Sequence, residues 1–450
     1  MNGYSLENPF SRSFIISGGI FILIVAASLS FVVSPLTVLL PFAGAALLWV
    51  VFHYPIATLG AVLAFIPVDY MAIELGKFFG LPYMTVVSVC DKEVPLLLLA
   101  FILGWRNGFK PFAPDWFLLA CFTIAVVHTV FDGTLVGLWG DFNFILPYFV
   151  GRVTLLTQKQ ELLWAKCAVW IAAVLSLLGL VEVFILGETP RTLLYLATGG
   201  EADAGGLSGA FHGTGFTGLR EAATMVGPPS FGALCMVALI IWWVYCRNPL
   251  PAGMIAVGLI CSVTRSAWLG TVVAISVLAF TMDQKKRLFL YAALALALFA
   301  ASIPVLGLSD YLLSTKTGQD TSAESHRHDI LAGLQYASDH PFGSGNSKLS
   351  PTTFRQDSNA TVFETTYPQL AAEYGIVAAL FFVAFWFSAL YVAWRKHSEL
   401  GYVAAGILVG TGLVMVVTLP FADRRLACWA LLPIGLAVRP FGSMVKRETA

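Results

Sequence analysis

Apolar runs of about membrane-crossing length alternate with short polar connections along most of the chain. A transmembrane helix needs about 20 mostly apolar residues, because each residue adds about 1.5 Å along the axis. The apolar runs are 14–33, 36–52, 56–73, 83–104, 116–131, 143–156, 162–186, 229–245, 252–264, 266–282, 287–307, 368–394, 401–421 and 426–438. Several are short, so we expect broken or tilted helices among them. The pattern predicts an all-α polytopic integral membrane protein with about 12–14 transmembrane helices.

The first apolar run, from Phe14 to Val33, follows Arg12 and resembles a secretory signal sequence. It is too long for the apolar region of a typical cleaved signal, and the next run begins soon after it, at Leu36. We therefore expect an uncleaved first transmembrane helix.

Basic residues cluster in alternate short connections, and an excess of Lys and Arg marks the cytoplasmic side. With the N-terminus inside, the clusters from Arg106 and Lys110 to Lys285-Lys286-Arg287 all fall inside. The sequence therefore predicts N-in/C-in, with two long outer loops. The predicted parts are N-terminal transmembrane helices (1–187), a first outer loop (188–228), central transmembrane helices (229–307), a second outer loop (308–366), C-terminal transmembrane helices (367–438) and a cytoplasmic tail (439–450).

The second outer loop contains a helical pattern from Ser325 to Ser338, in which Ile330, Leu331 and Leu334 share one face. This spacing predicts a helix lying on the membrane surface. Loops of this length in a compact protein are usually functional or disordered. Candidate chemistry is therefore sought in the two outer loops.

Composition excludes several classes of protein. Hydrophobic residues make up 58% of the 450 residues and charged residues 12%, about half the charge of a soluble globular protein. Lys plus Arg and Asp plus Glu both number 26, so the net charge of zero argues against nucleic acid as a partner. The seven cysteines are scattered without a CxxC pair, which favours buried thiols over disulfides or metal ligands.

Three arginines near predicted membrane boundaries are candidate ligands. Arg220 lies shortly before the chain re-enters the membrane at Pro228, and Arg265 lies between two short apolar runs on the outer side. The guanidinium fork suits bidentate phosphate binding; the alternative is ion pairing or snorkelling to headgroups. Arg152, near the inner residue Lys159, is better explained as a structural or snorkelling arginine.

Glu364 precedes the last group of apolar runs. A carboxylate at this boundary could be a general base with a pKa raised by desolvation, or an acid that favours a helix N-terminus. His326, His328 and His340 flank Arg327 and a glycine-rich turn, but residues i and i+2 of a helix face different ways. No metal site is predicted.

A different class of function, a transporter or lipid flippase, also has candidate residues. Asp69, Asp91 and Glu182 lie in or near predicted spans, and intramembrane ionisable groups often mark transport pathways. No matched pair of Gly/Pro-broken segments accompanies them. The concentration of unusual charge in the outer loops favours an enzyme.

Four motifs together resemble the bacterial O-antigen ligase and O-antigen/exopolysaccharide polymerase superfamily. They are GLREAATMVGPPSFGALC (218–235), TRSAWLG (264–270), SHRHDILAGLQYASDHPFGSGNSKL (325–349) and ETTYPQLAAEYGIVAALFF (364–382). The resemblance covers about 218–382, whereas residues 1–217 match only as a series of spans. Order, spacing and placement on the predicted outer side carry the resemblance.

The resemblance implies a membrane glycosyltransferase at the outer side of the bacterial inner membrane. Its donor would be a polyprenyl-diphosphate-linked glycan, and its acceptor another lipid-linked repeat unit or a lipid A core. By position, Arg220 and Arg327 would hold the diphosphate, with Arg265 as a third arginine. These arginines would replace a divalent cation, so no cofactor or metal is implied.

Glu364 occupies the position where the ligase family has a histidine, which favours a polymerase-type enzyme with Glu364 as general base. A ligase with a lipid or protein acceptor remains an alternative. The expected partners are the lipid-linked donor, the glycan acceptor, membrane lipids and a chain-length regulator or export complex. Further candidates for substrate contact are Arg152, His326, His328, His340, Tyr367, Arg424 and Arg425.

Overall fold

The computed structural model describes residues 46–68, 72, 93–186, 228–306, 321–349, 363, 365–419 and 424–439. The chain forms two units, Met1–Thr58 and Leu59–Ala450, and each is described by itself. In the first unit the described residues are helical apart from Tyr54. The described residues of the second unit form helices and connections and contain no strand.

The described helices vary widely in length. They are α3 (Pro55–Phe65), the 3-10 turn Ile66–Val68, α6 (Glu93–Asn107), α7 (Ala113–Asp132), α8 (Leu135–Phe142), α9 (Ile145–Val153), α10 (Gln158–Val181, continued by the π-helical turn Glu182–Leu186), α13 (Pro228–Tyr245), α14 (Pro249–Cys261), α15 (Arg265–Thr281), α16 (Lys285–Leu306), α18 (Thr321–Asp339), α19 (Asn346–Leu349), α21 (Thr366–Tyr374), α22 (Ile376–Arg395), α23 (Glu399–Val414) and α24 (Arg424–Ala437).

Six helices in the described part of the chain are long and apolar enough to cross a membrane, or seven if the bent pair Ala46–His53 and Pro55–Val68 is one span. The prediction of an all-α polytopic membrane protein is therefore confirmed. The total of 12–14 helices, the N-in/C-in orientation and the division into six parts stay predictions.

One predicted apolar segment, 368–394, is two helices in the structure. It breaks at Gly375, where φ is 89°, a conformation that favours glycine. A Cβ atom there would lie 2.8 Å from the carbonyl carbon of Phe342. The break therefore exists because the preceding loop packs against the backbone at this point, and hydrophobic periodicity does not report such a contact.

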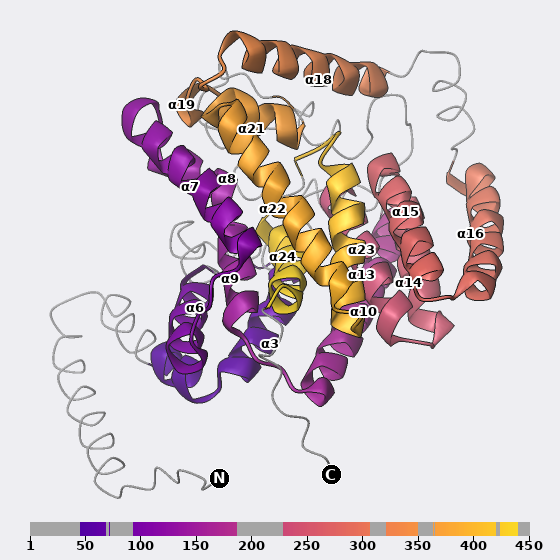
Figure 1. Ribbon diagram of the computed structural model, residues 1–450. Coiled ribbons are helices and arrows are strands. Elements are labelled where there is room, and N and C mark those ends of the chain that lie inside the picture. Colours follow the sequence, from indigo (N-terminus) through magenta and orange to yellow (C-terminus); the bar gives the residue numbers. More distant parts are fainter. Residues whose placement is uncertain are drawn as a thin grey trace, which may run out of the picture. The chain divides into compact units, whose positions relative to one another are not determined.

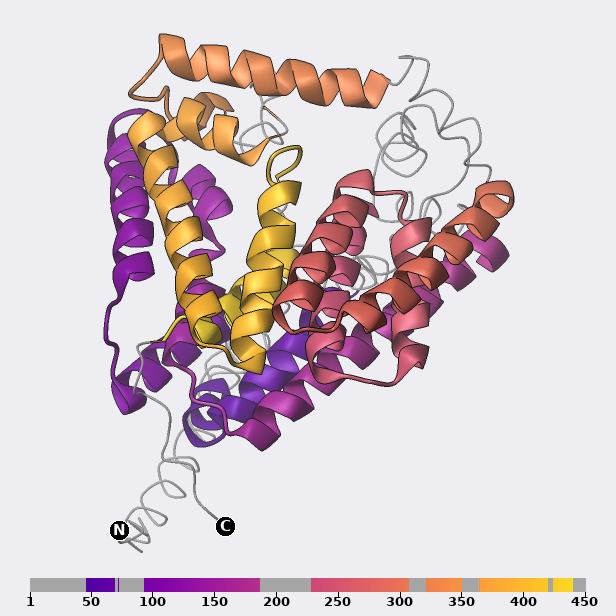
Figure 2. The same ribbon diagram turned by 45° about the vertical axis from the view of Figure 1, so that its right-hand side comes forward.

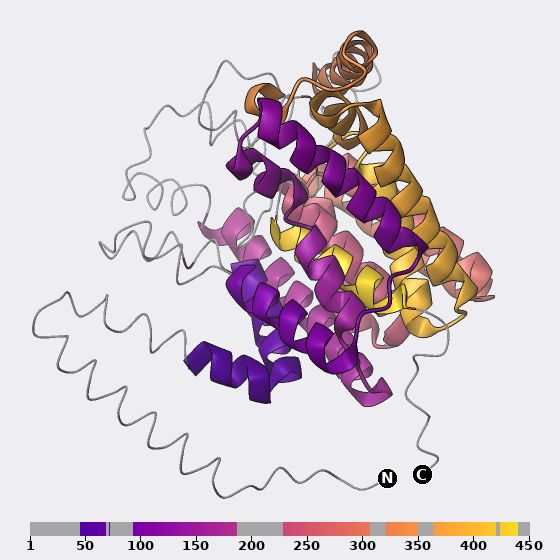
Figure 3. The same cartoon turned by 60° about the vertical axis from the view of Figure 1, so that its left-hand side comes forward.

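Glycines allow the central helices to approach closely. A Cβ atom at Gly151 of α9 would lie 2.3 Å from Leu432 O of α24, and one at Gly435 would lie 2.1 Å from Tyr148 O. Small residues at helix interfaces are typical of membrane proteins, because van der Waals packing drives association there. Figure 3 shows α9 beside α24.

Helix α18 lies across one end of the helices of the second unit and next to α21 (Figures 1 and 2). At the periphery of the second unit, α16 has no buried residue among those whose exposure is described, 285–303. The helix predicted over 325–338 corresponds to α18, which is longer in the structure and spans Thr321–Asp339.

A buried ion pair joins the start of α7 to the end of α9. Arg152 donates from Nε to Asp115 Oδ1 at 2.8 Å and from Nη2 to Asp115 Oδ2 at 2.6 Å. Tyr148 OH donates to the same carboxylate at 2.8 Å, and the Phe112 backbone N–H at 2.7 Å. Because Arg152 also donates to Lys110 O at 2.9 Å, its guanidinium is engaged in structural contacts.

We expect Asp115→Asn to lower the free energy of unfolding by about 3 kcal/mol, because it leaves the Arg152 charge buried without its carboxylate. Thermal unfolding of the purified protein in detergent measures this. The matched control is Asp283→Asn, since Asp283 is exposed and lies 4.0 Å from Lys285 Nζ. Equal melting temperatures for both variants would show that the Asp115–Arg152 ion pair does not stabilise the fold.

Candidate functional site

Two of the principal predicted residues, Arg220 and Glu364, lie outside the described residues, as do the transporter candidates Asp69 and Asp91 and the side chains of Glu182 and Arg424. The other candidates fall on described helices and can be placed.

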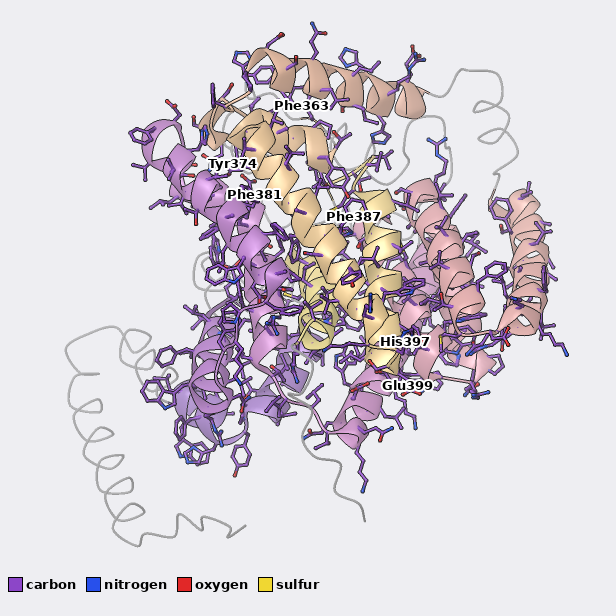
Figure 4. The ribbon with its side chains drawn as sticks, in the orientation of Figure 1. Phe363, Tyr374, Phe381, Phe387, His397 and Glu399 are labelled. Carbon is purple, nitrogen blue, oxygen red and sulfur yellow. The ribbon has the colours of Figure 1, made fainter. Side chains whose placement is uncertain are left out.

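Helix α18 carries Arg327 and packs on α21. Arg327 and His328 are exposed, and His328 Nδ1 lies 3.7 Å from Asp329 Oδ1. A Cβ atom at Gly333 would lie 2.7 Å from Pro368 Cβ, so the two helices touch there. Figure 4 shows Phe363 and Tyr374 at the end that α18 covers, whereas His397 and Glu399 lie at the opposite end.

The start of α21 is bonded to the end of α23 and the turn that follows it. The Thr366 backbone N–H donates to Met415 O at 3.0 Å, and its hydroxyl donates to Thr418 O at 2.8 Å. Tyr367 OH donates to Gly412 O at 3.3 Å. Burial raises the pKa of the Tyr367 phenol to about 12, so it remains a donor at neutral pH.

Helix α15 brings Arg265 to the end of the second unit that α18 covers. Added Cβ atoms at Gly410 and Gly406 would approach Ala274 and Leu278 respectively, so α15 and α23 are antiparallel. The start of α15 therefore lies beside the end of α23. Arg265 is the first residue of α15 and is half-buried. The partial positive charge of a helix N-terminus adds to that of Arg265, which favours an anion in this region.

Arg152 lies far from this end. The Asp132 end of α7 meets Gly345 of the loop after α18, whereas Arg152 pairs with Asp115 at the other end of α7. Asp115 and Asp132 are 17 positions apart, which corresponds to a rise of roughly 25 Å along a helix. This placement fits the structural interpretation of Arg152.

Arg425, the second residue of α24, is half-buried.

The glycine-rich turn after α18 inserts between α7 and α21. Gly343 and Gly345 have φ of 86° and 80°, and a Cβ atom at Gly345 would lie 2.1 Å from Asp132 O. The backbone N–H groups of Ser344 and Gly345 donate to Ala372 O and Glu373 O, both at 2.9 Å. The motif thus has a structural role that requires glycine.

The histidines of this region have different surroundings. His340 is exposed, stacks on Tyr336 with ring centroids 4.4 Å apart, and places Nδ1 3.2 Å from Tyr336 O. His326 is half-buried. In the described part of the chain, no group of three or more His, Cys, Asp or Glu side chains could hold a metal ion; the expectation that the enzyme needs no metal stays a prediction.

Asn346, which is fully buried, connects three elements. Its Oδ1 accepts from the Thr134 N–H at 2.7 Å, and its Nδ2 donates to Thr134 O and to Tyr374 OH, both at 3.1 Å. Tyr374 OH in turn donates to Asp141 Oδ2 at 2.6 Å. Asn346 therefore joins the connection between α7 and α8 to the end of α21.

Next to these hydrogen bonds, the carboxyl groups of Glu373 and Asp141 lie side by side. Glu373 of α21 is 1% exposed and is hydrogen-bonded to Asp141 of α8. Burial, followed by the charge of Asp141, raises the pKa of the Glu373 carboxyl well above its ordinary value. The negative charge of the neighbouring, half-buried Asp141 carboxylate therefore favours the protonated form of Glu373.

Sequence reasoning did not identify Asn346, Gln369, Glu373 or Asp141. Glu373 was visible only as the acid of a Glu-x-Gly motif before Gly375. A buried acid in an apolar stretch is a signal of function or of pairing, but its partner is more than 200 residues away in sequence. The pairing follows from the packing of α8 on α21's neighbours.

Residues 250–383 match the model of the O-antigen ligase family. The matched stretch contains Arg265, Arg327, Gln369 and Glu373, and Arg220 precedes it. The predicted resemblance to the O-antigen ligase and polymerase superfamily is confirmed. The chain matches no curated protein.

We expect the stability of the protein to fall as pH rises above the ordinary carboxyl pKa. The contribution of a protonated Glu373 is complete below 4.5, its pKa in the unfolded chain, and is lost as pH rises through its raised folded-state pKa. Melting temperatures between pH 5 and 9 should therefore decline more steeply in the wild type than in Glu373→Gln. Parallel curves for the two proteins would contradict a protonated Glu373.

Proposed function

We propose that this chain is a membrane glycosyltransferase that polymerises polyprenyl-diphosphate-linked oligosaccharide for O-antigen or exopolysaccharide synthesis. It would act at the outer side of the bacterial inner membrane. The observation that supports this most is that the O-antigen ligase match contains both Arg265 and Arg327. The helices that carry them are connected through packed contacts at one end of the second unit.

The connection runs through α18, α21, α23 and α15. Gly333 brings α18 onto Pro368, and Thr366 bonds the start of α21 to the end of α23. Gly270 then packs α15 against Gly410 of α23. Because every step is a close contact or a hydrogen bond, this framework can hold two arginines in a fixed relation at one surface.

The reaction needs charge stabilisation and a base. An acceptor hydroxyl oxygen attacks the anomeric carbon of the donor, the bond from that carbon to the diphosphate oxygen breaks, and polyprenyl diphosphate leaves with the electron pair. Arg327, Arg265 and Arg220 would neutralise the charge that develops on the diphosphate. Glu364 would take the proton of the attacking hydroxyl.

Glu364 is also the residue that favours polymerase over ligase, because the ligase family has a histidine at the matching position. A ligase would transfer glycan of unaltered length to a lipid or protein acceptor. The products therefore separate the two enzymes, and a transporter would form no new glycosidic bond.

We expect Arg327→Ala and Arg265→Ala each to lower turnover roughly 100- to 1000-fold, because each removes a donor to the developing diphosphate charge. The assay follows joining of lipid-linked oligosaccharides by purified protein in detergent without an ion gradient. Lys286→Ala, which removes an exposed positive charge at the start of α16, is the control. Unaltered turnover in either arginine variant would remove that arginine from the diphosphate site.

We expect Glu364→Gln to lower turnover roughly 100- to 10,000-fold, because the amide cannot accept the hydroxyl proton. In cells, gels of surface glycan should show single repeat units. Unattached polymer of normal length would instead indicate a ligase. Normal amounts of normal polymer would exclude Glu364 as the base.

A further inference from the structure

Gln369 of α21 is hydrogen-bonded to the backbone beside residue 364. Its Oε1 accepts from the Phe363 backbone N–H at 2.7 Å, and its Nε2 donates to Leu349 O and to Glu373 Oε1. The side chain is 3% exposed, so water does not compete for these bonds. One amide therefore connects the end of α19, the chain at Phe363 and the end of α21.

Three partners fix the orientation of this amide: the Phe363 N–H donates to it, and Leu349 O and Glu373 Oε1 accept from it. Because Glu373 Oε1 accepts a hydrogen bond, the NH₂ group of Gln369 must face it, and the amide oxygen must then face the Phe363 N–H. Glu373 itself is held by its hydrogen bond to Asp141, which also accepts from Tyr374 OH. Asp141, Glu373 and Gln369 therefore form a continuous hydrogen-bonded path from α8 to Phe363, and Tyr374 joins this path at Asp141.

The chain on the other side of residue 364 is also anchored. Thr365 is fully buried, and Thr366 bonds to Met415 O and Thr418 O through its N–H and its hydroxyl. The groups that hold the chain on the two sides come from different elements. Phe363 is held by Gln369, which is bonded to α19 and α21 and reaches α8 through Glu373. Thr366 is held by carbonyl groups at the end of α23 and in the turn that follows it. The described residues on the two sides of position 364 in the sequence, Phe363 and Thr366, are therefore each held by their own hydrogen bonds.

We propose that Gln369, oriented by the Glu373–Asp141 carboxyl pair, is a positioning residue that fixes the backbone beside the catalytic carboxylate at position 364. This inference rests on the proposed role of Glu364. Gln369 and Glu373 do not contact substrate in this scheme. They act on the reaction through the Phe363 N–H.

A positioning role differs from a merely stabilising one in its kinetic signature. Misplacement of a base by about 1 Å can cost roughly 100-fold in the chemical step. Arg265 and Arg327, which would bind the donor diphosphate, lie on other helices, so donor binding should be preserved. The effect is therefore expected in kcat, with the donor KM unaltered.

The test compares Gln369→Met, Gln369→Glu, Glu373→Met and Glu373→Gln in the full chain in detergent. The donor is the polyprenyl-diphosphate-linked repeat unit extracted from a deletion strain. Both Gln369 variants lose the two Nε2 donations, and the Glu variant keeps an acceptor for Phe363 N–H, which guards against failure of one variant to fold. Thr271→Val, which removes a buried hydroxyl that donates to Ala267 O of its own helix, is the matched control.

We expect kcat to fall roughly 100-fold in Gln369→Met and Glu373→Met, with the donor KM within about twofold of wild type. Glu373→Gln should lose far less, since its amide can still donate to Asp141 and accept from Gln369. Hydrogen exchange of the peptide that contains Phe363 should accelerate in both methionine variants and not in Thr271→Val.

Each outcome decides between two interpretations. Unchanged kcat in folded Gln369→Met and Glu373→Met, a rise in donor KM alone, or unchanged exchange at Phe363 in these two variants would overturn the positioning role. Wild-type turnover in Glu364→Gln would overturn the proposed base instead. The exchange measurement would still report whether Gln369 holds the chain at Phe363, so the two failures are distinguishable.

Discussion

Backbone hydrogen bonds between the turn after α18 and the end of α21 hold the candidate site together. The N–H groups of Ser344 and Gly345 donate to α21 carbonyls at 2.9 Å, and the Ile376 N–H donates back to Pro341 O at 3.0 Å. A Cβ atom at Gly343 would lie 2.5 Å from Glu373 O. Because backbone meets backbone here, the position of α18 depends on the glycines of the turn.

The apolar runs of the sequence predicted most helices well and the breaks within them poorly. Helix α13 begins at Pro228 and ends at Tyr245, one residue from its predicted start at 229 and at its predicted end, because proline and then a polar stretch delimit it. The break at Gly375 was missed, since apolar residues continue across it. Its cause is a contact with Phe342, which no local pattern encodes.

The arginines of the candidate site could be predicted from sequence, whereas the buried network behind them could not. Arg265 and Arg327 stand out because charge is rare in this chain. Asn346 resembles any loop asparagine, and its partner Thr134 is 212 residues away. The structure also shows two ways to bury an acid: Asp115 is paired with Arg152, while Glu373 is bonded to Gln369 and Asp141, and burial raises the pKa of its carboxyl.

Helix α16 has no buried residue between 285 and 303, and this has a consequence for how its sequence can vary. Arg287 fixes one end of it, donating to Trp243 O at 2.9 Å and to Cys246 O at 3.0 Å, and the rings of Tyr291 and Phe299 pack on Trp242 and Trp268. At 22 residues it is about 33 Å long, close to the thickness of a bilayer core. At the other positions of α16 hydrophobic length is the main requirement, so these positions can accept many apolar substitutions, and the tilt of the helix should follow the thickness of the surrounding membrane.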